Sequence, residues 1–167
     1  MDRYRRQQLI KESNEECSKL IDQGQFILYH RGKPLLEKSE FKIQNNRPQT
    51  VSYAQVSKYV QNIDKEAVFL RFNDSEKEIP IFAAMLPKDA TNIEEIENSV
   101  DGKFVDMRAA LFLVRSEWSG LMSGGSSLLR WIKSAKFCWS CKAPLTRNTS
   151  GCQLKCSNTE YVCYLFL

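Results

Sequence analysis

The sequence predicts an α+β protein that ends in a small cysteine-rich module. Short apolar runs bounded by turn-forming residues alternate with segments of helical periodicity, which predicts a mixed or antiparallel sheet with flanking helices. Five of the six cysteines fall within the last 30 residues. At 167 residues, the chain is long enough for one compact domain and a small appendage. We therefore expect a domain over residues 1–136 and a separate module over residues 137–167.

The first third of the chain is expected to form a helix, a hairpin and a short second helix. A partial apolar face over residues 5–23 predicts the first helix, and Gly24 is a common stop signal. Residues 26–29 form a β-rich run that leads into the turn-like segment 31–34, which predicts a strand and a hairpin turn. Ser52 then stands where an N-cap would precede apolar residues at helical spacing.

The middle of the chain is expected to form a second hairpin. The apolar runs 67–72 and 79–86 are separated by a polar segment, as in two strands joined by a turn. Pro80 lacks a backbone donor, so the second run is either an edge strand or a strand that begins at this residue.

Two helical segments are expected before the cysteines, over residues 106–114 and 128–132. The low-complexity stretch Ser-Gly-Gly-Ser-Ser at residues 123–127 lies between them. Its composition predicts a flexible joint between two helices. Gly124 and Gly125 lack the preceding strand that a phosphate-binding loop requires, so the pair indicates a hinge.

The charge pattern favours neither nucleic acid nor a membrane as partner. The net charge is +4, from 24 Lys and Arg against 20 Asp and Glu, and the two signs are interleaved along the chain. A nucleic-acid-binding protein typically carries a concentrated basic stripe instead. The longest apolar run, around residues 109–114, is far shorter than the roughly 18 residues that suggest a membrane span.

No catalytic constellation is visible in the sequence. His30 is the only histidine, and it has no matching Ser or Cys pattern that would suggest a triad. Trp118, Trp131 and Trp139 are more typical of core or interface packing than of stacking on a nucleotide base. We therefore assign no catalytic and no cofactor-binding residue.

The cysteine spacing predicts a structural zinc site. Cys138 and Cys141 form a Cys-x-x-Cys pair, and Cys152 and Cys156 can supply a second pair after a ten-residue hairpin. Four thiolates would fill the tetrahedral coordination of Zn²⁺ and leave no open position. In an alternative ligand set, Cys163 joins Cys156 and Cys152 is left out. A redox pair and ordinary buried thiols remain further alternatives, although no thioredoxin-like context surrounds the pair.

The order of several motifs resembles a known enzyme family. The motifs are Phe-Val-Asp-Met-Arg-Ala-Ala-Leu-Phe at residues 104–112, Ser-Leu-Leu-Arg-Trp at 127–131 and Phe-Cys-x-x-Cys at 137–141. In this order they are similar to the middle of the NADH pyrophosphatases of the Nudix superfamily. The segments 25–30 and 34–36 also have counterparts in the animal mitochondrial NAD(P)H pyrophosphatases.

The resemblance implies a Nudix-like N-terminal domain followed by a zinc ribbon and, in complete enzymes, by a catalytic Nudix domain. Complete enzymes cleave NADH to reduced nicotinamide mononucleotide and AMP, with Mg²⁺ or Mn²⁺ held by the glutamates of the Nudix box. The resemblance further implies NAD(P)H as ligand and a homodimer or a pairing with the full-length enzyme. It implies a mitochondrial location, with the cytoplasm as the alternative.

The sequence departs from the family in one decisive respect. The Nudix box, Gly-x5-Glu-x7-Arg-Glu-[apolar]-x-Glu-Glu-x-Gly-[apolar], does not occur in it. The acidic pairs at residues 15–16 and 94–95 lack the preceding Arg-Glu and the glycines, and are typical of solvated helix surface. We therefore expect a chain that stops before the catalytic domain and is not catalytic by itself. The alternatives are a protein-interaction or dimerisation module that alters the full-length enzyme, and an unrelated zinc-ribbon adaptor.

Overall fold

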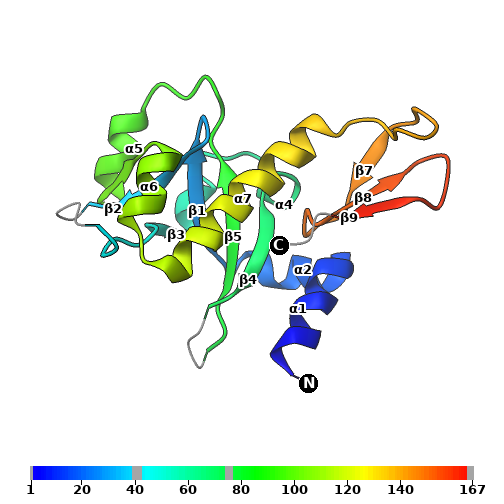
Figure 1. The fold of residues 1–167 in the computed structure, drawn as a ribbon, viewed down its shortest axis with the longest axis horizontal. Helices are drawn as coiled ribbons and strands as arrows, with labels where there is room; N and C mark the ends of the chain where they lie inside the picture. The colour runs from blue at the N-terminus through cyan, green and yellow to red at the C-terminus, as the bar shows by residue number, and fades with distance from the viewer. Residues whose placement is uncertain (1, 39–42, 74–76, 165–167) are drawn as a thin grey trace.

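A computed structural model describes residues 2–38, 43–73 and 77–164 of the chain. They form a mixed six-stranded sheet with helices on both faces, and a small three-stranded antiparallel sheet at the C-terminal end (Figure 1). The α+β prediction is thereby confirmed. The helices are α1 (Arg3–Glu12), α2 (Asn14–Ile21), α3 (Tyr53–Val56), α4 (Ile63–Glu66), α5 (Ile93–Ser99), α6 (Met107–Leu113) and α7 (Ser116–Ser134). The strands are β1 (Gln25–His30), β2 (Lys33–Glu37), β3 (Thr50–Ser52), β4 (Val68–Phe72), β5 (Pro80–Met85), β6 (Gly102–Phe104), β7 (Leu145–Arg147), β8 (Gln153–Cys156) and β9 (Val162–Tyr164).

The large sheet has the strand order β4-β5-β1-β2-β6, and β3 pairs with the start of β1. Both predicted hairpins are present as the antiparallel pairs β1–β2 and β4–β5. Residues 74–76, in the segment that joins β4 to β5, lie outside the described residues. Pro80 begins β5, which confirms the second of the two roles predicted for it. Strands β1 and β5 pair in parallel, which makes the sheet mixed.

Both faces of the sheet are buried. Phe26 and Leu28 of β1 pack into a cluster that includes residues of α2, α3, α4 and α5. The alternate residues, Ile27 and Tyr29, pack on the opposite face against Leu128 and its neighbour on α7. Since successive side chains of a strand point to opposite faces, a strand covered on both sides is a continuous apolar run. This is the pattern that residues 26–29 show.

Helix α7 is continuous, so the flexible joint predicted at residues 123–127 is wrong. Gly124, Gly125 and Ser126 are buried inside the helix. A Cβ atom added to Gly125 would lie 2.9 Å from the Tyr29 hydroxyl and 3.2 Å from the Ala83 Cβ. The Tyr29 hydroxyl in turn donates a hydrogen bond of 2.8 Å to the Met122 carbonyl. The small residues therefore allow the helix to pack close to the sheet. Composition alone does not distinguish this role from that of a flexible joint.

The N-terminal segment is two helices and not the single helix expected over residues 5–23. The chain is extended at Ser13 (φ −96°, ψ 117°), and the Ser13 hydroxyl accepts a hydrogen bond from the Glu16 backbone N–H. Ser13 therefore caps α2 and separates it from α1. By contrast, the predicted cap at Ser52 is confirmed, since Ser52 and Gln55 form a reciprocal capping box at the start of α3.

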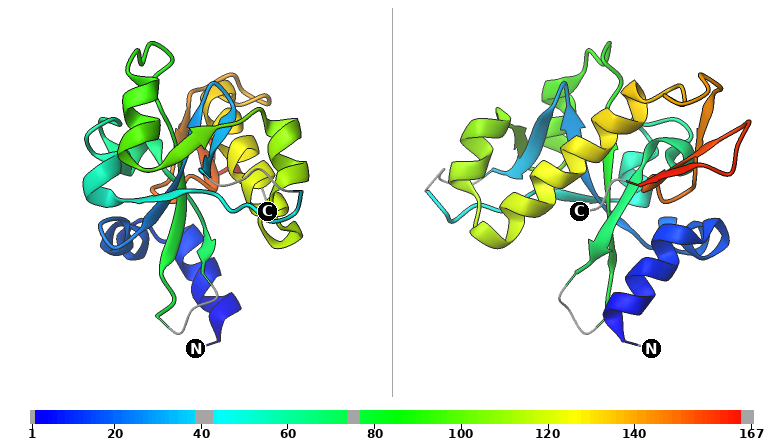
Figure 2. Two further views of the ribbon diagram at one scale, coloured as in Figure 1. Left: turned by 90° about the vertical axis from the view of Figure 1, so that its left-hand side faces the viewer. Right: turned by 45° about the vertical axis from the view of Figure 1, so that its right-hand side comes forward.

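The small C-terminal sheet is docked against the large one through the turn between β7 and β8, residues 148–152, called here the docking turn. Its Ser150 carbonyl accepts a 2.8 Å hydrogen bond from the Phe69 backbone N–H on β4. The Asn148 side-chain amide and the Ser150 hydroxyl both donate to the Lys11 carbonyl, at 2.6 and 2.7 Å. Because Lys11 lies just before the break between α1 and α2, that corner and the edge strand together hold the docking turn (Figures 1 and 2).

We expect Gly125→Ala to lower the free energy of unfolding by about 1–2 kcal/mol. Overpacking a filled core costs about 1–3 kcal/mol, and the gain of about 1 kcal/mol in helix propensity offsets part of it. The matched control is Gly120→Ala on the same helix, where an added Cβ meets nothing within 4 Å. That variant should be stabilised by up to about 1 kcal/mol. Chemical unfolding of both variants measures the difference, and equal stabilisation of the two would contradict the close packing at Gly125.

Candidate metal centre

Three cysteines of the small sheet gather in one place. The Sγ atoms of Cys138, Cys141 and Cys156 all lie within 4.8 Å of one another, and those of Cys141 and Cys156 are 3.4 Å apart. Cys138 follows the end of α7, Cys141 lies in the next turn, and Cys156 ends β8. At 3.4 Å the closest pair is not bonded, because a disulfide brings its sulphurs to about 2.05 Å.

The local backbone explains why the first two thiols point to the same place. The Lys142 N–H donates to the Cys138 carbonyl at 2.8 Å, and the Cys138 N–H donates to the Ala143 carbonyl at 2.8 Å. Lys142 adopts a left-handed conformation with φ 61°, which reverses the chain. An antiparallel bridge between Phe137 and Pro144 closes the turn. The Cys-x-x-Cys segment thus forms a tight loop that brings both sulphurs onto the end of β8.

Hydrogen bonds favour a thiolate at Cys156. The Thr159 hydroxyl and then the Asn158 backbone N–H, 3.4 Å from Sγ, lower the pKa of Cys156 to about 6. At Cys141 a backbone N–H bond from Ala143 also lowers the pKa, but the neighbouring thiols of Cys156 and Cys138 outweigh it and leave the pKa raised. Hydrogen bonds to the charged form are a general means of lowering a pKa. Because a metal ion binds the deprotonated form of cysteine, a thiophilic cation at this cluster would release the protons that its ligands still carry.

The three sulphurs could bind a metal ion. Soft thiolate ligands suit Zn²⁺, which takes four ligands in tetrahedral geometry in structural sites. Among the residues that the structure describes, no other group of three or more potential ligands lies within the same distance limit. The chain therefore supplies three convergent donors for an ion, and the identity of the fourth ligand stays open.

Cys152 lies apart from the other three predicted ligands. It is buried in the cluster formed with Val68 and Leu129, and its Sγ lies 3.5 Å from the Phe69 carbonyl. Burial raises its pKa, so its surroundings favour a neutral thiol. The reason is geometric: residues four apart on an extended chain are separated by about 13 Å, too far for two sulphurs to reach one ion. Cys152 belongs to the docking turn. Three of the four predicted ligands converge, and the complete four-cysteine set stays a prediction.

Cys163, the alternative ligand, lies on β9. Its Cα pairs with that of Leu154 in the register of β8 and β9, and its side chain is half-buried. It is not within 4.8 Å of all three sulphurs of the triad. Instead it lines a groove of about 540 Å³ between the end of α7 and the small sheet. The aromatic residues of this groove, called here the aromatic groove, are Trp131, Phe137, Trp139, Tyr161 and Tyr164.

The acidic pairs of the sequence lie on helix surface. On α2, Glu15 and Glu16 each form an ion pair of 2.8 Å with Lys19. The hydrogen bond from Lys19 is the main cause that lowers the pKa of Glu15. Glu94 and Glu95 are exposed in the first turn of α5. This agrees with the prediction that these carboxylates are solvated side chains.

Comparison with known proteins establishes the family. Residues 23–131 match the family described as NADH pyrophosphatase-like rudimentary NUDIX domain. The chain belongs to this family. The match contains all six strands of the large sheet and most of α7, so the rudimentary NUDIX domain is the body against which the small sheet packs. The family expected from the motif order is thereby confirmed.

Two relatives extend the similarity beyond the rudimentary NUDIX domain. The human mitochondrial NAD(P)H pyrophosphatase NUDT13 is 26% identical over 163 residues, which covers 93% of this chain and 46% of the human protein. Mouse mitochondrial NUDT13 is 28% identical over 171 residues, with the same coverage of 93% and 46%. The chain thus spans about half the length of these relatives. None of the helices in the described ranges combines the length and apolar character needed to cross a bilayer.

Alanine substitution should separate the triad from Cys152. We expect Cys156→Ala to lose bound zinc, because it removes one of three convergent donors. Cys152→Ala should keep the same zinc content and lose about 1–2 kcal/mol of stability, because it only vacates space in the core. Metal analysis after dialysis, paired with chemical unfolding, measures both quantities. A folded Cys152→Ala protein without metal would place Cys152 in the ligand set after all.

Proposed function

We propose that this chain acts as the non-catalytic N-terminal and zinc-ribbon portion of a NAD(P)H pyrophosphatase-type Nudix protein. The observation that carries the proposal is the order of its parts: a rudimentary NUDIX domain over residues 23–131 and, directly after it, a cysteine triad on a three-stranded sheet. The printed names of the human and mouse relatives supply the substrate class, NAD(P)H. The same names support a mitochondrial location as part of this proposal.

The absence of catalysis is proposed from the chemistry that hydrolysis of a pyrophosphate needs. In the two-metal form of this chemistry, clustered carboxylates hold the divalent cations that activate water and neutralise the leaving phosphate. The sequence has no Nudix box, and in the described part of the chain the triad of cysteines is the only metal-ligand cluster. Mg²⁺ or Mn²⁺ would belong to a complete enzyme and not to the residues described here.

In this proposal Zn²⁺ has a structural role. Held by Cys138, Cys141 and Cys156, it would tie the loop that follows α7 to the end of β8. The fourth ligand stays open between Cys152, the residue first predicted, and the alternative Cys163. The small sheet has little apolar core of its own beyond the buried Leu154 and its cysteines, so metal binding would supply folding free energy there.

The purified chain should release no AMP from NADH above the buffer background, with either Mg²⁺ or Mn²⁺ present. Chromatographic detection of AMP measures this, and a full-length NAD(P)H pyrophosphatase in the same buffer is the positive control. Metal-dependent release that co-elutes with the chain through two columns, and that disappears when Glu94 and Glu95 are both changed to Gln, would refute the proposal. It would mean that carboxylates on α5 assemble a site.

A second candidate function, a dimerisation module, is favoured by the aromatic groove. Phe137 is 64% exposed and Trp139 is 79% exposed beside it. Large aromatic side chains in this position are typical of protein interfaces, where Trp and Tyr are enriched. A second copy of the chain, or the same region of a full-length protein, is the partner in this alternative.

If the aromatic groove pairs two chains, Trp139→Ser should convert a dimer into a monomer, because it removes an exposed anchor without touching the core. The matched control is Phe112→Ser, which removes a side chain that is 74% exposed on α6, far from the small sheet (Figure 1). Light scattering coupled to size-exclusion chromatography gives the mass of each variant. A wild-type chain that is monomeric at every concentration tested rules out this alternative.

A further inference from the structure

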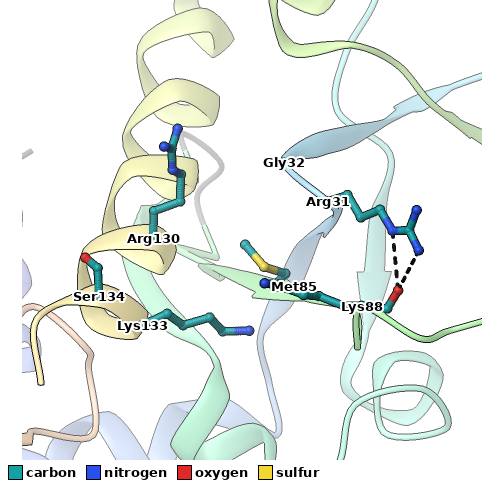
Figure 3. A pocket seen from close by; sticks show the side chains of 7 residues that line it. All are labelled: Arg31, Gly32, Met85, Lys88, Arg130, Lys133 and Ser134. Atoms are coloured by element: carbon teal, nitrogen blue, oxygen red, sulfur yellow. Dashed lines mark hydrogen bonds between the residues drawn. The ribbon is translucent and has the colours of Figure 1, made fainter.

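A second groove lies on the rudimentary NUDIX domain itself and is lined by cations. It has a volume of about 630 Å³ and lies between the last turns of α7, the turn that joins β1 to β2, and the end of β5 (Figure 3). We call it the cationic groove. Its lining residues are Arg31, Gly32, Met85, Lys88, Arg130, Lys133 and Ser134.

The charge in this groove is concentrated. Four of its seven lining residues are cationic and none is acidic. The entire chain has a net charge of +4, and the number of cationic side chains that line this one groove equals that net charge. Lys133 forms an ion pair with Glu66 at 3.9 Å, and both side chains are nearly half exposed. Such an exposed pair contributes little, so the groove keeps a strong positive potential.

The cations come from separate elements. Arg130 and Lys133 project from α7, and Lys88 lines the groove from the segment after β5. The Arg31 side chain, from the β1–β2 turn, is directed away from α7 toward the Lys88 carbonyl (Figure 3). The Arg31 guanidinium donates to the Lys88 carbonyl through Nε at 3.3 Å and Nη2 at 3.0 Å. These two bonds use two of its five N–H donors and fix the fork at the rim of the groove.

Arg31 also occupies a backbone position that seldom favours arginine. With φ 48° it is left-handed, and Gly32 follows with φ 82°. Two-residue turns with both residues at positive φ prefer Asn or Asp followed by Gly. An arginine there costs stability relative to those residues, which suggests a role for its side chain. Burial lowers the pKa of the neighbouring His30, and the charges of Arg31 and Lys33 lower it further. The contribution from these two charges agrees with a positive potential at this turn.

We propose that the cationic groove binds the diphosphate group of a small nucleotide-type ligand. Arginine forks and lysine ammonium groups are the usual partners of phosphate oxygens, and cations on two walls match an anion with two charged groups. The volume lies in the range of small-molecule sites and exceeds what a diphosphate alone fills, which leaves room for an organic substituent over Met85. A nucleic acid would need a basic track that continues beyond one groove. The site requires neither catalysis nor the metal centre.

Calorimetric titration of the full chain with ADP, inorganic pyrophosphate, AMP and inorganic phosphate tests the proposal. ADP and pyrophosphate should bind more tightly than AMP and phosphate, and added salt should weaken all of them. Arg130→Gln and Lys133→Gln should each weaken ADP at least about 10-fold, because each removes a charge-assisted hydrogen bond. Both positions are exposed on α7 and glutamine is a good helix former, so the variants should fold, as circular dichroism will show.

The matched control is Lys103→Gln, which removes an exposed cation from β6 outside the groove and should leave ADP affinity unchanged. Absence of ADP and pyrophosphate binding by the folded wild type would overturn the proposal. So would an equal loss of affinity in Lys103→Gln, since that would indicate screening by overall charge. A fluorescent single-stranded oligonucleotide that binds more tightly than ADP and responds to the same two variants would also overturn it, in favour of a nucleic-acid backbone as the ligand.

Discussion

A partly buried guanidinium is central to the docking of the small sheet on the large one. Arg147 donates to the carbonyls of Lys65 and Ala67, just before β4, and to that of Thr149 in the docking turn. Its partial burial lowers its pKa. Desolvating a cation is costly unless hydrogen bonds replace the lost water. Here charge-assisted bonds to carbonyls do so, and the two to Lys65 and Ala67 form only when the two sheets are in contact.

That contact determines where the metal centre lies. The docking turn ends at Cys152, whose side chain joins the core beneath α7, and β8 then runs outward to Cys156. The other end of the triad, Cys138, is set by the end of α7. The segments that lead to Cys138 and to Cys156 therefore both start at the rudimentary NUDIX domain. A metal ion at the triad would close a loop that is already anchored at two points.

Local signals in the sequence predicted most elements, and contacts distant in the sequence determined the rest. The two hairpins β1–β2 and β4–β5, the start of β5 at Pro80 and the Cys-x-x-Cys loop each depend on residues close in the chain, whereas β3, β6 and β9 were not predicted as strands. Gly125 looked flexible because its partner, Tyr29, is almost 100 positions away. The spacing of Cys152 and Cys156 does not reveal that the chain between them is extended, so the sequence did not show which three cysteines converge. The cationic groove draws on three separate segments, so no run of basic residues in the sequence reveals it.

Helix α7 connects the two candidate sites, and its own electrostatics explain only part of the cationic groove. The C-terminal end of a helix carries partial negative charge, which favours basic residues such as Arg130 and Lys133 in its last turns. This effect accounts for those two residues without any ligand. It does not account for Arg31 and Lys88, which are on other elements and gain nothing from the dipole by position in the helix. Their presence in the lining, on elements other than α7, is what distinguishes the proposed anion site from ordinary helix capping.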